Sequence, residues 1–208
     1  MWPSAVALSR WVVTNPDEVC NKRILELGAG CGLVGLIAAR LQVQKGESSV
    51  EKPSVILTDF NEVVLKNADR NIHLNGVEGI AEAMGLDFYQ QTGDRNQWID
   101  MSGALREQVD LVLAADIICQ PEDAFAAAKA INDSLRFGGK AIIICADSKH
   151  RFGVERFEEG CLELGLEIRT ENVLDICEGK LFRNCLDKTT GYVDGMSLSM
   201  FTVEKPTQ

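Results

Sequence analysis

The chain has 208 residues, of which 46% are hydrophobic, and its formal net charge is −10. This length can bury one sizeable core, so we expect a single domain over residues 1–208. The acidic balance argues against a protein that tracks nucleic-acid phosphates, because such a protein needs a basic face. A basic peptide or a small molecule is the better partner.

Cysteine usage and hydropathy predict an intracellular protein. The seven cysteines form no C-x-x-C pair, which predicts neither a zinc ribbon nor a disulfide framework. Cys145 and Cys161 fall on apolar faces, where a thiol behaves as a small hydrophobe. No apolar run reaches transmembrane length, and no signal segment follows Met1. We therefore predict a soluble protein of the cytoplasm, with the nucleus as an alternative, that binds neither a metal nor a membrane.

Strand-like and helix-like segments alternate along the chain, which predicts an α/β fold with a parallel sheet and helices on both faces. Strands are expected at residues 24–27, 55–58, 81–86, 111–115, 140–145, 166–174 and 198–203. Apolar stripes with helical spacing begin at Leu33, Val64, Ala124 and Val154, and the third stripe extends to Leu135. Asn75-Gly76, Gly138-Gly139 and Gly165 are expected to end the last three helices. Residues 42–53 and 177–195 are the long irregular stretches, and neither marks a domain boundary.

The most informative stretch is Glu26-Leu27-Gly28-Ala29-Gly30-Cys31-Gly32-Leu33-Val34-Gly35, which follows the first expected strand. Its glycines allow a sharp turn and a close approach of the backbone to a ligand. The helix that follows opens its free N–H groups toward the same crevice. The stretch therefore predicts a nucleotide-cofactor turn, although it also satisfies G-x-G-x-x-G, the dinucleotide fingerprint.

Acids at the strand ends separate the two cofactor classes. A dinucleotide brings a pyrophosphate, whereas S-adenosylmethionine (AdoMet) brings a sulfonium and an ammonium that carboxylates attract. Glu26 and Asp87, at the ends of the first and third strands, favour AdoMet. Asp59, at the end of the second strand, can accept ribose hydroxyls in either class. It lies further along the chain than the dinucleotide acid, which usually follows the glycines by about 20 residues.

The whole pattern resembles the seven-β-strand AdoMet-dependent methyltransferases, and within them the small protein-lysine methyltransferases. The resemblance covers nearly the entire chain. It is carried by Trp2-Pro3-Ser4-Ala5, Leu25 to Gly35, Thr58-Asp59, Asn71 to Gly76, Leu86-Asp87-Phe88 and Asp110 to Ile118. It implies a Rossmann-like sheet of order 3-2-1-4-5-7-6 with the last strand antiparallel.

The resemblance also implies a set of cofactor contacts. Gly28, Ala29 and Gly30 would line the methionine part of AdoMet, beside Glu26. Asp59 would take the ribose hydroxyls, and Asp87 and Phe88 would border the adenine. Phe60 would be a further cofactor contact, Ala115 would lie beneath the cofactor, and Trp2 would cover its edge from an N-terminal segment spanning residues 1–20. Purely structural interpretations of these residues remain open. The glycines alone make a tight strand-to-helix turn, Asp59 suits a helix N-cap, and Asp87, Phe88 and Trp2 are of types common in loops and cores.

By resemblance, Asp116 is the catalytic residue, because the family places this acid at the end of the fourth strand facing the transferred methyl group. Methyl transfer is an in-line displacement that needs alignment more than covalent help. A lysine amine must be neutral to react, while its usual pKa is about 10.4. Asp116 would orient that amine or guide its proton to water. The alternative is an acid that only accepts hydrogen bonds from neighbouring backbone.

The relatives carry an aromatic residue three positions after this acid, and here that position is Cys119. An aromatic ring would wall the lysine channel and stabilise a cation, which a thiol cannot do. Phe125, Phe152, Phe182 or Tyr192 are candidates for the missing wall. A catalytic role for the Cys119 thiol is the more specific hypothesis, but no histidine lies nearby in the sequence to activate the thiol.

Acceptor recognition is expected from variable loops. The basic quartet 148–151 lies at the pocket rim, where it would contact an acidic stretch of substrate or remain solvated. Residues 177–195 form a candidate substrate lid, with a plain connection as the alternative. The first functional hypothesis is methyl transfer from AdoMet to a protein side chain, above all a lysine amine. A small-molecule methyltransferase and a non-catalytic binding module with the same fold are the alternatives, and a nicotinamide-dependent oxidoreductase comes last.

Overall fold

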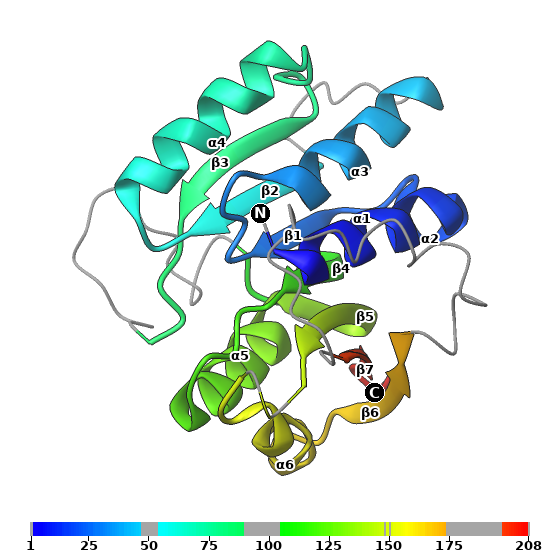
Figure 1. The fold of residues 1–208 in the computed structure, drawn as a ribbon. Helices are drawn as coiled ribbons and strands as arrows, with labels where there is room; N and C mark the ends of the chain where they lie inside the picture. Colours follow the sequence, from blue (N-terminus) through cyan, green and yellow to red (C-terminus); the bar gives the residue numbers. More distant parts are fainter. Residues whose placement is uncertain are drawn as a thin grey trace.

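The computed structural model describes residues 2–46, 54–89, 105–147, 149, 151–173 and 197–207. They contain a seven-stranded sheet of order β3-β2-β1-β4-β5-β7-β6, drawn in Figure 1. The strands are β1 (Ile24–Leu27), β2 (Val55–Asp59), β3 (Ala81–Gly85), β4 (Val109–Ala115), β5 (Leu135–Ala146), β6 (Glu167–Asn172) and β7 (Leu198–Glu204). β7 pairs antiparallel with β5 and β6, whereas β1 to β5 pair parallel. The predicted α/β class and the predicted strand order are both confirmed.

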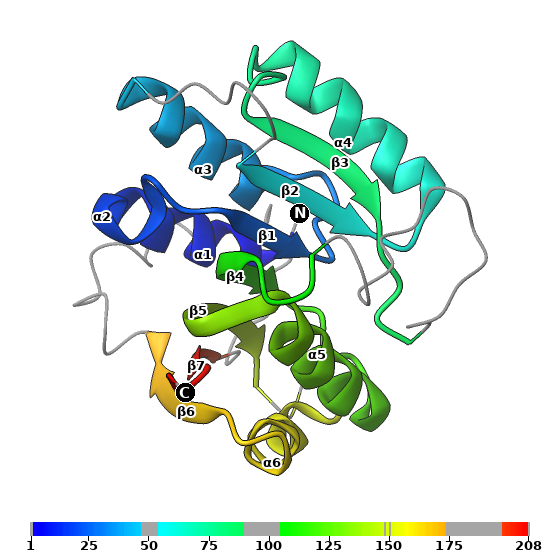
Figure 2. The ribbon, with the colours of Figure 1, turned by 180° about the vertical axis from the view of Figure 1, so that it is seen from behind.

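Helices cover both faces of this sheet, as the two opposite views in Figures 1 and 2 show. The helical elements are α1 (Pro3–Thr14), α2 (Pro16–Val19), α3 (Leu33–Gln44), α4 (Glu62–Leu74), α5 (Pro121–Ser134), the 3₁₀ turn η1 (Val154–Arg156) and α6 (Phe157–Glu163). Apolar residues of α1, α3 and α4 share one buried cluster with the sheet, and those of α5 and α6 share the other. Alternate residues of β4 belong to opposite clusters, because successive side chains of a strand point to opposite faces.

The N-terminal helix α1 was not identified by the sequence analysis, and neither was the short helix α2 that follows it. Pro3 occupies the first turn of α1, where a missing N–H does no harm. Leu8 and Val12 lie one helical turn apart, and both are buried with Ala7 in the same cluster as Val34 of α3. This spacing of apolar residues is the sequence feature that could have predicted α1. The helix carries Trp2, at its N-cap position, to the carboxyl ends of the strands.

Several element boundaries differ from the prediction, and three of the differences change the type or length of an element. Leu135, expected to be helical, begins β5 and pairs with Val109, so that Gly138 lies within the strand and not at a helix end. α3 continues to Gln44, which shortens the irregular stretch expected from residue 42. The helix expected from Val154 begins as the 3₁₀ turn η1. The C-terminal cap expected after α4 is confirmed, since Gly76 has a φ of 59°.

By this topology, the expected ligand crevice lies at the carboxyl ends of β1, β2 and β4. β1 pairs with β2 on one side and with β4 on the other, and the connections that follow β1 and β4 leave toward opposite faces. Ligands of open parallel sheets bind at this switch in strand order. The candidate lid at residues 177–195 lies outside the described residues. Among the described helices, none has the length and apolarity that crossing a membrane requires.

Candidate functional site

The turn between β1 and α3 is held against the end of β2. The backbone N–H of Ala29 donates to the Thr58 carbonyl at 2.7 Å, and the N–H of Gly30 donates to the Asp59 carboxylate at 3.1 Å. Gly30 has a φ of +57°, and a Cβ built on it would meet no atom within 4 Å. The turn therefore presents bare backbone to open space, which is the geometry that the sequence predicted for a cofactor cradle.

Glu26 is turned away from that space and into the fold. Its side chain lies on the same face of β1 as Ile24, is 3% exposed, and accepts a hydrogen bond from the Gly35 N–H at 2.9 Å. Burial raises the pKa of this carboxyl to about 8. A carboxyl with this pKa is largely neutral near pH 7, so its Coulomb attraction for a cation is weaker than the sequence argument assumed. Its visible role is to join β1 to the first turn of α3.

Asp59 is the acid that reaches the crevice. One carboxylate oxygen accepts from Gly30 and the other accepts from the N–H of Asn61 at 3.0 Å. The N-cap of α4 is Asn61, whose side chain accepts from the N–H of Val63 at 2.9 Å. Asp59 is therefore not the helix N-cap that its structural interpretation required. Phe60, between the two polar residues, is 64% exposed and available to a flat ligand.

The segment after β3 crosses toward the same edge of the sheet. The N–H of Leu86 donates to the carbonyl of Asp59 at 3.0 Å, and the Asp87 side chain accepts from the N–H of Tyr89 at 2.9 Å. Phe88 is half-buried against the main core cluster, with its ring 6.0 Å from that of Tyr89. The contacts of Asp87 and Phe88 with an adenine stay a prediction.

Asp116 follows β4 directly and has a φ of 61°, a left-handed conformation that aspartate tolerates better than most residues. Its side chain is 3% exposed and forms an ion pair with Arg151, with 2.6 Å between Oδ2 and an Arg151 guanidinium nitrogen. The other oxygen accepts from the N–H of Ala146 at 3.2 Å. The Arg151 guanidinium carbon lies 5.0 Å from the centre of the Trp2 ring. This pair was not foreseen, because the sequence analysis expected Arg151 in a rim loop that contacts substrate or solvent.

Cys119 is exposed and lies between two acids. Its thiol is 4.0 Å from the carbonyl of Asp116, and its backbone N–H donates to Asp123 at 2.8 Å. The Tyr89 hydroxyl donates to the other oxygen of Asp123. Partial desolvation raises the pKa of the Cys119 thiol above its usual value, which disfavours the thiolate that a nucleophilic role would need.

Tyr89 is therefore the aromatic residue that the structure brings toward Cys119, and the sequence analysis missed it. Phe125 is half-buried under Arg156, with a guanidinium-to-ring distance of 5.0 Å, and Phe152 is 72% exposed beside Arg151. The other two candidates for the missing wall, at residues 182 and 192, lie outside the described residues. The position of Tyr89 directly after the predicted site residues Asp87 and Phe88 could have identified it, but only the fold brings Tyr89 to α5.

The remaining predicted contacts lie around the same crevice. Gly28 and Ala29 form the first part of the turn, and Ala29 is buried. Ala115 is the last residue of β4 and is half-buried beside the cluster that contains α3. Trp2 is 56% exposed at the N-cap of α1. The structure thus gathers the predicted cofactor residues at the carboxyl ends of neighbouring strands, while their contacts with a bound cofactor remain predictions.

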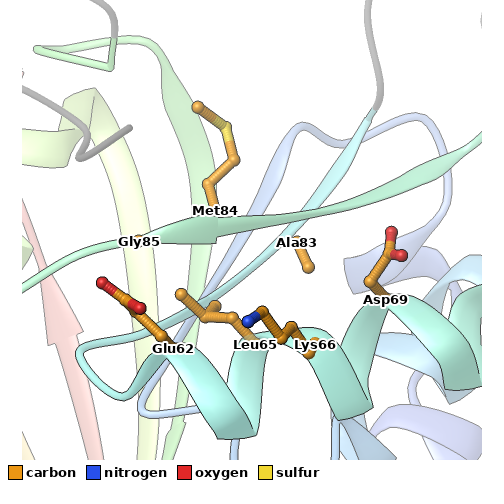
Figure 3. Close-up of a pocket in the computed structure, with 7 residues that line it drawn as sticks. All are labelled: Glu62, Leu65, Lys66, Asp69, Ala83, Met84 and Gly85. Atoms are coloured by element: carbon orange, nitrogen blue, oxygen red, sulfur yellow. The ribbon is translucent and has the colours of Figure 1, made fainter. Parts of the chain in front are cut away.

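A separate hollow of about 770 Å³ lies between α4 and the edge strand β3 (Figure 3). Its lining is Glu62, Leu65, Lys66, Asp69, Ala83, Met84 and Gly85. None of these is a predicted site residue. Within the described ranges, no group of three histidine, cysteine or acidic side chains is arranged to hold a metal ion.

The crevice suits a nucleoside that bears a positive charge. A Cβ built on Gly30 would lie in open space, and the Gly30 N–H donates to the Asp59 carboxylate beside it. A pyrophosphate would meet a carboxylate there, where it needs N–H donors. The donor set thus fits a ribose with vicinal hydroxyls better than a diphosphate.

Comparison with known proteins agrees with this geometry. A sequence profile of the family described as lysine methyltransferase matches residues 1–159. The chain is 30% identical over 126 residues to the human protein-lysine N-methyltransferase EEF2KMT, covering 58% of this chain and 35% of that protein. It is 28% identical over 182 residues to the protein N-lysine methyltransferase METTL21A of Danio rerio, covering 83% of this chain and 69% of that protein.

Solved structures share the fold at low sequence identity. Geranyl diphosphate methyltransferase in complex with SAM superposes with a TM-score of 0.65 at 9% identity, covering 96% of this chain and 85% of that chain. Such a likeness concerns the fold and leaves the acceptor open. The chain spans about a third of the length of EEF2KMT. Because the family profile covers most of the chain, the protein belongs to the lysine methyltransferase family.

Proposed function

We propose that this chain is an AdoMet-dependent N-methyltransferase that transfers a methyl group to a lysine amine of a protein. Family membership supports this activity, and the names of EEF2KMT and METTL21A support a lysine acceptor. The observation that carries the proposal is the contact between the Gly30 N–H and Asp59 at 3.1 Å. It joins the bare glycine turn and the acid of β2 into one cradle beside Asp116.

The described residues divide between the parts of the cofactor. Gly28, Ala29 and Gly30 would line the methionine part, with Glu26 behind them; Asp59 would accept the ribose hydroxyls; Phe60, Asp87 and Phe88 would border the adenine; Ala115 would lie beneath and Trp2 would cover the edge. The exposed rings of Phe60 and Trp2 suit these places, because an aromatic face covers a planar base. When bound, AdoMet supplies an electrophilic methyl carbon on a sulfonium.

The chain's own part in the reaction is to align a neutral amine. The nitrogen lone pair forms the new N–C bond, the electron pair of the S–C bond stays on sulfur, and the amine proton is lost to water. Alignment of this kind contributes through proximity and orientation. Asp116, at the end of β4, is the acid proposed to stand beside the amine, and the residues around Cys119 and Tyr89 would form the wall of its channel.

The first test compares cofactor binding in matched variants. Purified wild-type protein, Asp59→Ala and Asp69→Ala are titrated by calorimetry with AdoMet, S-adenosylhomocysteine and NAD. Asp69 is an exposed acid of α4 outside the crevice, so its variant controls for lost charge. We expect saturable binding of both sulfur compounds but not NAD. Asp59→Ala should weaken binding about tenfold or more, since a lost charge-assisted hydrogen bond contributes roughly 1.5–3 kcal/mol.

The acceptor is then tested with methyl-tritiated AdoMet and a dialysed cell extract. After acid hydrolysis, label in methylated lysine would support the proposal, and label in another residue would contradict the lysine assignment. Label in dialysable metabolites alone would favour the small-molecule alternative. Cofactor binding without any transfer would favour the non-catalytic binding module. Equal binding by wild type and Asp59→Ala would contradict the proposed cradle.

Partner and location belong to the same proposal. The net charge of −10 favours a basic protein segment over nucleic acid as partner, because like charges repel. The cysteine pattern favours the reducing cytoplasm or nucleus. We also propose that residues 1–208 form one domain, in which residues 1–20 cover the cofactor and residues 177–195 cover the acceptor.

A further inference from the structure

The Asp116 carboxylate is already engaged within the chain. Its two oxygens accept hydrogen bonds from Arg151 at 2.6 Å and from the N–H of Ala146 at 3.2 Å, and its side chain is 3% exposed. An acceptor amine that reaches the end of β4 thus approaches an ion pair and not an isolated carboxylate. Any role of Asp116 toward the amine must include its arginine.

Arg151 is held on more than one side. Its backbone N–H donates to the carbonyl of Asp147 at 2.9 Å, its side chain is 19% exposed, and its guanidinium lies over the Trp2 ring at 5.0 Å. An arginine stacked on an aromatic face and paired with a carboxylate has a fixed orientation. Burial acts to lower the pKa of Arg151, but the hydrogen bond to Asp116 and the Coulomb attraction of its charge together more than offset this, so the pKa lies above its usual value. The positive charge is therefore permanent.

In the part of the chain that the structure describes, the other titratable groups around this pair leave its charge balance intact. Cys119 precedes α5 and Cys145 lies on β5, and burial raises the pKa of both thiols, that of Cys145 to about 12. Neither thiol carries a charge near neutral pH. Asp123 of α5 is occupied by two backbone N–H groups and the Tyr89 hydroxyl, and Asp147 accepts from Ser197. Among the described residues, Arg151 is the cation in contact with Asp116.

This balance matters for an amine nucleophile. A carboxylate close to an amine favours the ammonium form, which has no lone pair, whereas a nearby cation favours the neutral amine. A buried carboxylate without its arginine would hold the acceptor as an unreactive ammonium. The same carboxylate with its charge offset can accept a hydrogen bond from the amine without that penalty.

We propose that Arg151 is a positioning residue that fixes the Asp116 carboxylate and offsets its charge, so that the acceptor amine binds as the neutral nucleophile. The inference rests on the proposed lysine methylation and adds a specific role for a residue that does not itself touch the reacting atoms. It assigns the acceptor class as a primary or secondary amine approaching past the Trp2 and Arg151 side of the crevice.

The test measures the pH dependence of methyl transfer to a pool of random peptides with one central lysine. The enzymes are the wild type, Arg151→Gln, Arg151→Lys and Arg156→Gln. Arg156 is an exposed arginine five positions further on, paired with Glu159, and its variant is the matched control. We expect Arg151→Gln to move the acidic limb of the kcat profile, which reports pKa values in the enzyme–substrate complex, upward by about one pH unit or more, with rates converging on wild type at high pH. Arg151→Lys keeps the positive charge, so its acidic limb should lie close to the pH of the wild-type limb.

A second readout needs no turnover. n-Butylamine, a probe shaped like a lysine side chain, is titrated by NMR into each protein saturated with S-adenosylhomocysteine. Wild type should bind it more tightly as the pH rises and the neutral amine accumulates. Arg151→Gln should bind n-butylammonium near pH 7 about tenfold more tightly than wild type does, because an opposite charge favours the ammonium. Equal pH dependence in the two proteins would overturn the proposal, and so would the absence of amine binding by any variant.

The double variant Asp116→Asn/Arg151→Gln separates charge from architecture. It removes both charges together, so its acidic limb should return toward that of wild type even if its rate is lower. A purely structural role for Arg151 would instead lower the rate by the same factor at every pH, and the double variant would show no return. If no lysine peptide is methylated by wild type while the n-butylamine result holds, the protein-lysine proposal fails and the role of Arg151 stands.

Discussion

The acidic residues at the two ends of the crevice have different kinds of partner. At the β1 and β2 end, Glu26 and Asp59 accept hydrogen bonds from backbone N–H groups of the glycine turn and of α3. At the β4 end, Asp116 is paired with the guanidinium of Arg151. The first arrangement shapes the backbone, whereas the second balances a charge. The difference suits the proposed reaction, in which a cationic cofactor binds at one end and an amine is kept neutral at the other.

The largest expected effect comes from breaking the charge balance at the β4 end. Asp116→Ala would remove the carboxylate that pairs with the guanidinium of Arg151, and the Arg151 side chain is only 19% exposed. We expect a loss of about 3 kcal/mol in the free energy of unfolding, since removing one member of a buried pair is strongly destabilising. Asp59→Ala should lose only about 1 kcal/mol, because its backbone donors lie at an open turn. Urea unfolding of both variants measures the difference.

The Asp116→Asn variant is the control for shape, because its amide keeps the size of the carboxyl but not the charge. Equal destabilisation by Asp59→Ala and Asp116→Ala would mean that the ion pair contributes no more than the backbone contacts do. That outcome would remove the contrast between the two ends. S-adenosylhomocysteine affinity should fall with Asp59→Ala and stay near wild type with Asp116→Ala.

A smaller effect separates Gly30 of the glycine turn from Gly35 in the first turn of α3. A Cβ on Gly35 would lie 2.5 Å from the Glu26 carboxyl and 2.8 Å from Leu57, both in the packed interior. Gly35→Ala should therefore destabilise the fold by about 2–3 kcal/mol, as overpacking does. Gly30→Ala meets no atom within 4 Å and should lose only about 1 kcal/mol to backbone strain.

Cofactor affinity should reverse that ranking. The methyl group of Gly30→Ala projects into the proposed cofactor space, so it should weaken AdoMet binding more than Gly35→Ala does in the protein that remains folded. Calorimetric titration and thermal unfolding of the two variants measure both rankings. If Gly30→Ala binds AdoMet as wild type does, the open space over Gly30 is not the cofactor cradle.

Local sequence signals were sufficient for the sheet and for the cradle. The apolar runs before Glu26 and Asp59 specify buried strands, and the glycines between them specify the turn that the structure contains. The ends of elements were harder to predict. Leu135 continues an apolar helical stripe, but its backbone pairs with Val109 in the sheet, and tertiary pairing of this kind overrides local periodicity.

Contacts between distant segments could not be predicted from the sequence. Arg151 pairs with Asp116 across 35 positions, and Tyr89 reaches Asp123 across 34. Both contacts follow from the strand order, which brings the segments after β3, β4 and β5 to one edge. The family resemblance supplied the roles of Asp116 and Asp59, yet it gave no partner for either. The charge state of Glu26 also depends on burial, which no motif reports.

The last contrast concerns Glu26, whose pKa of about 8 in the folded protein compares with 4.5 in a model peptide. Between these values the folded state holds a proton that the unfolded state lacks, so stability from this group is full below about pH 4.5 and is lost as the pH rises through about 8. Glu26→Gln keeps the shape of the neutral acid without titrating. Its stability relative to wild type should therefore rise by about 1.4 kcal/mol per pH unit over this window, measured by urea unfolding at several pH values. A difference that stays constant with pH would mean that Glu26 is ionised in the folded protein. It would then be available to attract the sulfonium and ammonium of AdoMet, and the cofactor end would hold two charged acids instead of one.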